Sequence, residues 1–328
     1  MFIFNRNHST LLRRFVLLTL LGAFALAAVP VLTTAQVLYG TRAKGQMGFI
    51  NINASAPGTG DTGRPLFVLF GINGNVNSIE PFGDATYDAM QASLQRRWRN
   101  SIVGAVYTWS KAINYADNDA NPRIPFLPEK ERNRGPAGYD RRHNFQGYAV
   151  YDLPLGKGQK WIKGGVLSKL LGGWQLNGVL SATSGAPFYV IQNTAPNLLA
   201  AGSGQVPNQV KPEVEILGGI GTPAQRGAAG GRWFDITAYA VETGARFGSA
   251  GRNNVYGPGF FNIDAGIFRT LTFTESIKLQ FRAEALNALN HPNFANPQAN
   301  INDSNFGFIT ATVGQASRQW RFGMRLSF

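Results

Sequence analysis

The sequence predicts an all-β protein, an antiparallel up-and-down transmembrane β-barrel or partial barrel of about eight strands. Three observations lead to this prediction. The chain of 328 residues contains 39 glycines and 17 prolines, and only 15 % of its residues are charged. Seven segments alternate between apolar and polar side chains over about ten residues each. The connections between these segments alternate between short and long along the chain.

The composition excludes several other classes of protein. A mean hydropathy of −0.12 argues against a bundle of transmembrane helices, and the glycine and proline content argues against soluble helix bundles and coiled coils. Cysteine is absent, which excludes a disulfide scaffold, a cysteine zinc site and a cysteine nucleophile. The net charge is +13, but lysine and arginine are scattered along the chain, so we expect no nucleic-acid partner.

The amino terminus has the pattern of a secretory signal peptide. Residues 1–14 are polar and basic, residues 15–32 are almost wholly apolar, and small residues follow up to Ala35. We expect cleavage between Ala35 and Gln36. The alternative is an uncleaved membrane anchor, because the apolar run is just long enough to span a bilayer. In both cases the rest of the chain is exported.

The predicted strands follow the period-two alternation. They comprise 87–96, 101–111, 143–153, 174–184, 261–272, 277–286 and 317–328. A single-chain barrel with both ends on the same side needs an even number of strands. We therefore expect one further strand upstream, in Gly48–Asn53 or Leu66–Ile72.

The connections favour a membrane barrel over a soluble sandwich. Residues 97–100 and 273–276 form tight turns and 154–173 a connection of intermediate length, whereas 111–143, 184–261 and 288–317 are long and rich in Gly, Pro and Asn. Outer-membrane barrels place short turns in the periplasm and long loops outside. A β-sandwich also has alternating strands, but it gives no reason for this sorting of the loops.

No motif indicates catalysis or a metal site. The three histidines form no His-x-x-x-His pair. The stretch from Asp117 to Asp119 begins like a calcium loop, but Pro122 and Pro128 occupy the positions of the required Gly and Glu. We interpret it as a solvated acidic loop, and we expect no enzyme activity, cofactor or metal.

Several blocks resemble, in the expected order, the carboxyl-terminal barrel strands of Oar-like TonB-dependent outer-membrane receptors. They are YDAMQASLQRRW, YTWSKAIN, YDRRHNFQGYAVYDLPLGKG, LLGGWQLNGVLSATSGAPF, GRNNVYGPGFFNIDAGIFRTLTFTESIKLQFRAEALNALNHPNF and RQWRFGMRLSF. The resemblance implies a signal peptide (1–35), a short mature segment (36–47) and a barrel region (48–328). Members of this family also carry a regulatory β-sandwich, a plug and a barrel of about 22 strands. This sequence is therefore identified as a truncated or internally deleted member.

The resemblance implies transport across the outer membrane. The implied partners are outer-membrane lipid and lipopolysaccharide, the barrel-assembly machinery and an unidentified ligand. Because the plug and regulatory domains are missing from the resemblance, we keep a second function open, a non-transporting surface-binding protein that uses the long loops 112–142 and 185–260. A secreted soluble β-sandwich is the third alternative.

Two sets of residues on the last strands have predicted roles. An Arg on the lipid side at the bilayer midplane costs roughly 2–4 kcal/mol, so we predict that the polar set faces the lumen: Arg321, Arg325, Lys278, Gln280, Arg282 and Glu284. Arg269 lies on the apolar side near the short-turn end, where we expect it to extend to the periplasmic interface. The terminal Phe328 shares a face with Leu326, Met324 and Phe322, and the resemblance implies that this strand is the barrel-assembly signal.

Overall fold

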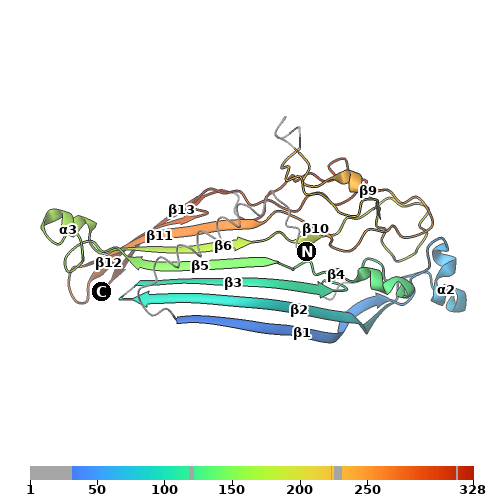
Figure 1. Cartoon of the computed structure of the whole chain (residues 1–328), viewed down its shortest axis with the longest axis horizontal. Coiled ribbons are helices and arrows are strands. Elements are labelled where there is room, and N and C mark those ends of the chain that lie inside the picture. Colours follow the sequence, from blue (N-terminus) through green and yellow to red (C-terminus); the bar gives the residue numbers. More distant parts are fainter. Residues whose placement is uncertain (1–31, 100, 118–121, 223, 225–230, 315–316) are drawn as a thin grey trace.

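Eight long strands form one antiparallel sheet, in which strands adjacent along the chain lie side by side (Figure 1). The computed structural model describes residues 32–328 apart from 100, 118–121, 223, 225–230 and 315–316, and for 32–49 and 82 it describes only the backbone. The strands follow one another across the sheet as β1 (Leu32–Asn51), β2 (Asn77–Trp98), β3 (Ser101–Asn114), β5 (His143–Asp152), β6 (Trp174–Thr183), β11 (Phe260–Thr272), β12 (Lys278–Leu286) and β13 (Gln319–Ser327).

The remaining elements are short and lie in the connections. The short strands are β4 (Gly135–Pro136), which pairs with β3, and two ribbons, β7 (Pro187–Phe188) with β10 (Val255–Tyr256) and β8 (Asn208–Gln209) with β9 (Tyr239–Ala240). The helices are η1 (Gly60–Gly63), α2 (Pro65–Phe70), η2 (Leu127–Asn133), α3 (Gly165–Leu171) and η4 (Ile236–Ala238). Within the described part of the chain, none of the helices combines the length and apolar character needed to cross a membrane.

All seven predicted strands are confirmed, and the upstream eighth strand is β1, which covers the beginning of Gly48–Asn53. The other candidate for it, Leu66–Ile72, is wrong because most of it belongs to α2. Pro65 suits the first turn of a helix, since its missing N–H has no helical partner there. Gly71 ends the helix with a left-handed φ of 70°.

The sheet begins earlier than the predicted barrel boundary at residue 48. β1 includes 36–47, which the sequence assigns to a separate segment before the barrel, and these residues pair with β2. Residues 1–31 of the predicted signal peptide lie outside the described residues. Ala35 and Gln36 oppose Ala92 and Gln91 in the sheet, and cleavage between them stays a prediction.

The two ends of the sheet carry different connections, as the sequence predicts. At one end lie the turns β2–β3 and β11–β12, the β5–β6 connection with α3, and the carboxyl terminus (Figure 1). At the other end lie the described residues of the four long loops 52–76, 115–142, 184–259 and 287–318. The first is referred to below as the short-turn end and the second as the long-loop end.

The register gives the sheet one apolar face and one polar face. Phe281 opposes Met324, Ala283 opposes Phe322, and Tyr107 opposes Phe145, so apolar side chains continue from strand to strand. This face is exposed at its edge, where 78 % of Phe322 is accessible. The soluble-sandwich alternative requires a second sheet against this face, and among the described residues the main sheet is accompanied only by two-residue ribbons.

The sheet is open. β1 and β13 are its two edge strands, and no pairing between them occurs in the described part of the chain. The sequence predicts two forms, a closed barrel and a partial barrel, and the structure has the partial form.

Candidate functional site: the loop cap

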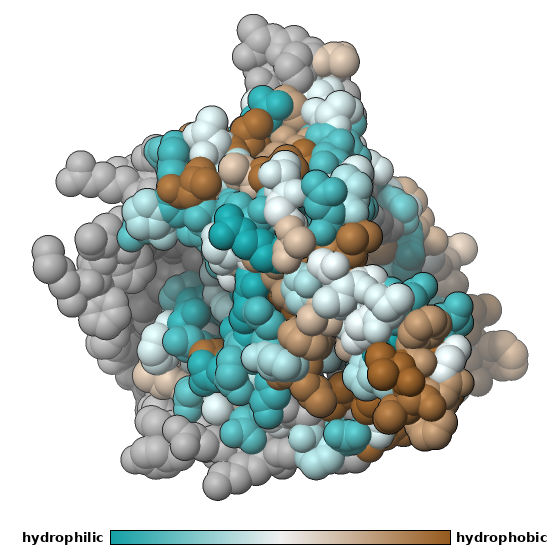
Figure 2. All heavy atoms as spheres, turned by 90° about the vertical axis from the view of Figure 1, so that its right-hand side faces the viewer, coloured by the Kyte–Doolittle hydropathy of each residue, from teal (hydrophilic) through white to brown (hydrophobic). Residues whose placement is uncertain are grey.

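The four long loops fold together into a body that we call the loop cap, defined by the described residues of 52–76, 115–142, 184–259 and 287–318. Its interior contains a hydrophobic cluster that draws on three of these loops, including Ile124, Phe188, Val190, Phe234, Tyr239, Phe247, Val255, Phe306 and Ile309. Seen from this end, hydrophilic residues cover much of the surface and hydrophobic residues gather on one side (Figure 2). The long loops are thus a packed structure with its own core.

Phe234 lies at the centre of this core. Its ring centroid is 5.3 Å from that of Phe306, 5.8 Å from that of Phe188 and 6.2 Å from that of Tyr239. The pairs with Phe306 and Tyr239 are edge-to-face, and such pairs contribute about 0.5–1.5 kcal/mol each beyond the burial of apolar area. Because Phe306 comes from the last long loop, these contacts join 287–318 to 184–259.

Arg252 joins a third loop to this body. Its guanidinium forms an ion pair with Asp117 at 2.8 Å, and its Nη1 donates to Oδ1 and to the carbonyl of Asn114 at 2.6 and 3.0 Å. Burial alone would raise the pKa of Asp117, but hydrogen bonds from the Gly138 N–H and Asn114, with the charge of Arg252, lower it. Asp117 is therefore both ordered and partly solvated: its carboxylate accepts bonds from three residues, and 33 % of its side chain is exposed. Residues 118–121 of the same stretch lie outside the described residues.

The first long loop is attached through backbone hydrogen bonds. The Gly58 and Gly60 N–H groups donate to the carbonyls of Leu198 and Leu199 at 2.7 and 2.6 Å. Within this loop the buried Arg64 donates to the Asn53 carbonyl and forms an ion pair with Asp61 at 2.8 Å. These contacts hold 52–76 against 184–259, so all four loops form one cap.

A second polar network lies at the surface of the cap core. Gln192 and Glu242 exchange two bonds, from Gln192 Nε2 to the Glu242 carbonyl at 2.8 Å and from the Glu242 N–H to Gln192 Oε1 at 2.9 Å. The Glu242 carboxylate accepts bonds from the Gly244 N–H, Asn208 and Arg246, which lower its pKa to about 2. Glu242 is therefore ionised at neutral pH.

Three buried polar atoms in the cap have no hydrogen-bond partner among the described residues: Arg123 Nε, Tyr189 Oη and Ser203 Oγ. The Gly204 N–H donates to the Arg123 carbonyl at 2.9 Å, so Arg123 lies close to Ser203. Burial lowers the pKa of Arg123. Burial also raises the pKa of Tyr189, and nearby arginine charges, among them that of Arg123, partly offset this rise. These atoms are candidates for contact with a bound polar molecule.

A cavity of 250 Å³ lies where the cap meets the polar face of the sheet. Its lining consists of Tyr87, Thr108, Ser110, Ala112 and Asn144 from β2, β3 and β5, and Tyr139, Asp140 and Arg141 from the cap. Asp140 is held in place because it accepts the Ala112 N–H at 2.7 Å. Its size suits a ligand smaller than a typical drug-sized molecule, and its rim offers hydroxyl, amide and guanidinium groups.

The register brings the six predicted lumen residues to one face of the sheet. Gln280 opposes Arg325, Arg282 opposes Gly323, and Glu284 opposes Arg321. Arg282 donates to Gln280 at 2.9 Å, and Lys278 opposes Ser327 on the same face. The same face carries polar contacts on β2, β5 and β6, where Gln95 donates to Tyr148 at 2.8 Å and Ser181 donates to Gln146 at 2.7 Å.

The predicted assembly strand is β13, at the edge of the sheet. Phe322, Met324, Leu326 and Phe328 are all exposed, and Phe328 lies just past the strand end. Arg269 is on the apolar face, opposite Trp174 and Phe281. Its guanidinium donates to the Lys169 carbonyl at the short-turn end, which is the direction that the sequence predicts.

A family model described as an outer membrane beta barrel domain matches residues 29–321, which extends from before β1 into β13. A comparison with curated proteins finds no match.

Proposed function

This chain belongs to the outer membrane beta barrel domain family and lies in the outer membrane, and from that premise we propose that it is a surface receptor of the TonB-dependent type. In this proposal the apolar face contacts lipid, the polar face lines the lumen, and the loop cap binds the ligand. The role is binding and passage of a ligand rather than catalysis.

The observation that carries the proposal is the folded core of the cap. Long loops of outer-membrane barrels point away from the cell, so the cap is the part that first meets external molecules. A cap held by Arg252 and by the Phe234 cluster presents fixed groups to a ligand, and such preorganisation lowers the entropic cost of binding. The cavity beside Asp140 and Arg141 is the proposed contact point.

The second candidate function is that of a surface-binding protein that does not transport its ligand. The position of the cap favours it. Asp140 and its neighbours in the cap lie against the polar face at the long-loop end of the sheet, where a transported ligand would have to pass. Both functions share ligand binding at the cap and differ only in whether bound ligand crosses the membrane.

Orientation is tested first, with single cysteines in a chain that has none. Leu217→Cys places a thiol on the exposed surface of the cap, and Ser276→Cys is the matched variant in the β11–β12 turn. A membrane-impermeant maleimide should label the first in intact cells and the second only after the outer membrane is permeabilised. Labelling of Ser276→Cys in intact cells would contradict the orientation.

Transport is tested by uptake in the presence and absence of a protonophore. Cells with and without the chain are incubated with fluorescent peptide and oligosaccharide panels, and surface-bound probe is then removed with protease or glycosidase. A receptor-transporter should show a protected fraction that the protonophore abolishes. Surface binding with no protected fraction leaves only the second function, and no binding above control cells refutes both.

A further inference from the structure

The β5–β6 connection combines positive charge with exposed apolar side chains. Residues 153–173 contain four exposed lysines, Lys157, Lys160, Lys163 and Lys169, and no acidic residue. None of the four forms an ion pair with any residue that the structure describes. The same connection exposes Trp161, Ile162, Val166, Leu167, Leu170 and Leu171, with 73 % of Val166 accessible. A water-exposed turn gains nothing from such a surface, whereas a membrane interface suits it.

This connection is attached to the apolar face of the sheet. Trp174 Nε1 donates to the Leu170 carbonyl at 3.2 Å, and Arg269 donates to the Lys169 carbonyl, so two residues of that face contact the last turn of α3. The Arg269 guanidinium lies 5.4 Å from the centroid of the Trp174 ring. The end of α3 therefore lies where the apolar face meets the short-turn end.

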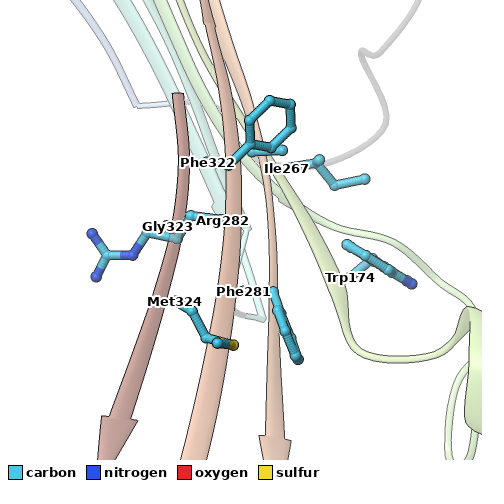
Figure 3. A pocket seen from close by; sticks show the side chains of 8 residues that line it. Trp174, Ile267, Phe281, Arg282, Phe322, Gly323 and Met324 are labelled. Carbon is cyan, nitrogen blue, oxygen red and sulfur yellow. The ribbon is translucent and has the colours of Figure 1, made fainter. Parts of the chain in front are cut away.

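An apolar groove begins at the same tryptophan. It has a volume of 480 Å³ and is lined by side chains from β6, β11, β12 and β13, among them Trp174, Ile267, Phe281, Ala283, Phe322 and Met324. Figure 3 shows Ile267, Trp174, Phe281 and Met324 on one side of the sheet and the Arg282 side chain on the other. The groove thus opens on the apolar face, beside the cationic connection.

We propose that this groove and the β5–β6 connection form a binding site for an anionic phospholipid of the periplasmic leaflet. The lysines and Arg269 attract the phosphate and its anionic headgroup, and an acyl chain lies along the groove from Trp174 toward Phe322. This site rests on the orientation of the proposed function, in which short turns face the periplasm, so the site meets the leaflet on that side. Basic residues beside an anionic lipid surface add attraction, and lysine stems lie along apolar surface while their ammonium groups stay in water.

The charge pattern is what selects this occupant. A zwitterionic lipid would fill the groove equally well but would gain little from four lysines that form no ion pair with the described residues. Tryptophan at a membrane interface places its ring at the headgroup level, which is the position of Trp161 and Trp174 in this arrangement.

The test uses the full chain reconstituted in phosphatidylcholine vesicles. A minor fraction of acyl-brominated lipid, either phosphatidylglycerol or phosphatidylcholine, is added, and bromine quenches tryptophan fluorescence on contact. Subtraction of a Trp161→Phe or Trp174→Phe variant isolates each ring. At equal mole fraction, brominated phosphatidylglycerol should quench both rings at least about threefold more than brominated phosphatidylcholine.

Charge variants decide the cause of that preference. Replacement of Lys157, Lys160, Lys163 and Lys169 by Gln should remove the preference, and replacement by Arg should keep it. A control, Lys130→Gln with Arg246→Gln, removes two positive charges from the cap end and should leave the preference unchanged. Equal quenching by the two lipids in the unmodified chain would overturn the proposal. Absence of quenching by either lipid would also overturn it, since another partner or water would then cover the site.

Discussion

Replacement of Arg252 by Ala should loosen the loop cap while the sheet stays intact. Arg252 comes from the third long loop, and its partners Asn114 and Asp117 come from the end of β3 and the loop that follows it. Alanine removes the guanidinium and leaves the carboxylate of Asp117 without its ion-pair partner. The contacts among the eight long strands do not involve this side chain.

The cost follows from the burial of the two partners. Only 6 % of the Arg252 side chain is exposed, whereas 33 % of Asp117 is exposed. Removal of one partner from a buried ion pair costs about 3–5 kcal/mol. Because water reaches the Asp117 carboxylate, we expect about 2–3 kcal/mol. At 1.4 kcal/mol for each factor of ten, the fraction of open cap should rise roughly 30- to 150-fold.

The assay is limited proteolysis of the folded chain in detergent, because the cleavage rate follows the open fraction when opening is fast compared with cleavage. Lys211→Ala is the control. Lys211 also forms an ion pair in the cap, at 2.6 Å with Asp235, but 48 % and 19 % of the two side chains are exposed. Such pairs contribute about 0–1 kcal/mol, so cap cleavage should rise less than about fivefold. Similar cleavage rates for Arg252→Ala and Lys211→Ala would refute the assignment of Arg252 as the buried anchor.

Three further predictions concern the membrane faces, pH and assembly. Met324→Arg should prevent the heat-modifiable folded form in lipid, at a cost of roughly 2–4 kcal/mol, whereas Arg325→Gln should fold normally; equal behaviour would refute the face assignment. Because the pKa of Glu242 falls from 4.5 to about 2 on folding, its carboxylate stabilises the cap fully above pH 4.5 and loses that effect as the pH falls toward 2. Fluorescence of the buried Trp233 should follow this loss, and Glu242→Gln should flatten the pH dependence over that range. Deletion of Phe328 should reduce outer-membrane insertion without affecting export, and normal insertion would refute its role as an assembly signal.

The strands and their faces could be predicted because alternation is a local property. Each residue of a strand points to the side opposite its neighbour, so the polar set around Arg282 and the apolar set around Met324 follow from spacing alone. Helix α2 was missed because its apolar run, Leu66–Ile72, is too short for periodicity to separate strand from helix. Pro65, which suits the first turn of a helix, and Gly71, which suits its end, were the local signals for α2.

The cap could not be predicted from the same pattern. Its contacts join residues far apart in the chain, such as Arg252 with Asn114 and Ser55 with Ala201. A long loop rich in glycine and asparagine has no period that shows which of its apolar residues meet. The only local signal was the density of aromatic residues in the loops, including Phe188, Trp233, Phe234 and Phe247, since solvated loops rarely contain so many.

Closure of the sheet is a different kind of problem, because it depends on strand number and stagger rather than on the faces of single strands. In a bilayer each backbone N–H and C=O needs a partner, since no water is present to replace one. The outer edges of β1 and β13 carry such groups along 20 and 9 residues, so within the membrane both edges need a strand beside them. The β12–β13 register, from Lys278 opposite Ser327 to Leu286 opposite Gln319, leaves the whole of β13 available on its other side. The strand that precedes Phe328 is therefore where we expect pairing to be completed in the membrane, and its exposed aromatic face gives a physical basis for the predicted role of Phe328 as an assembly signal.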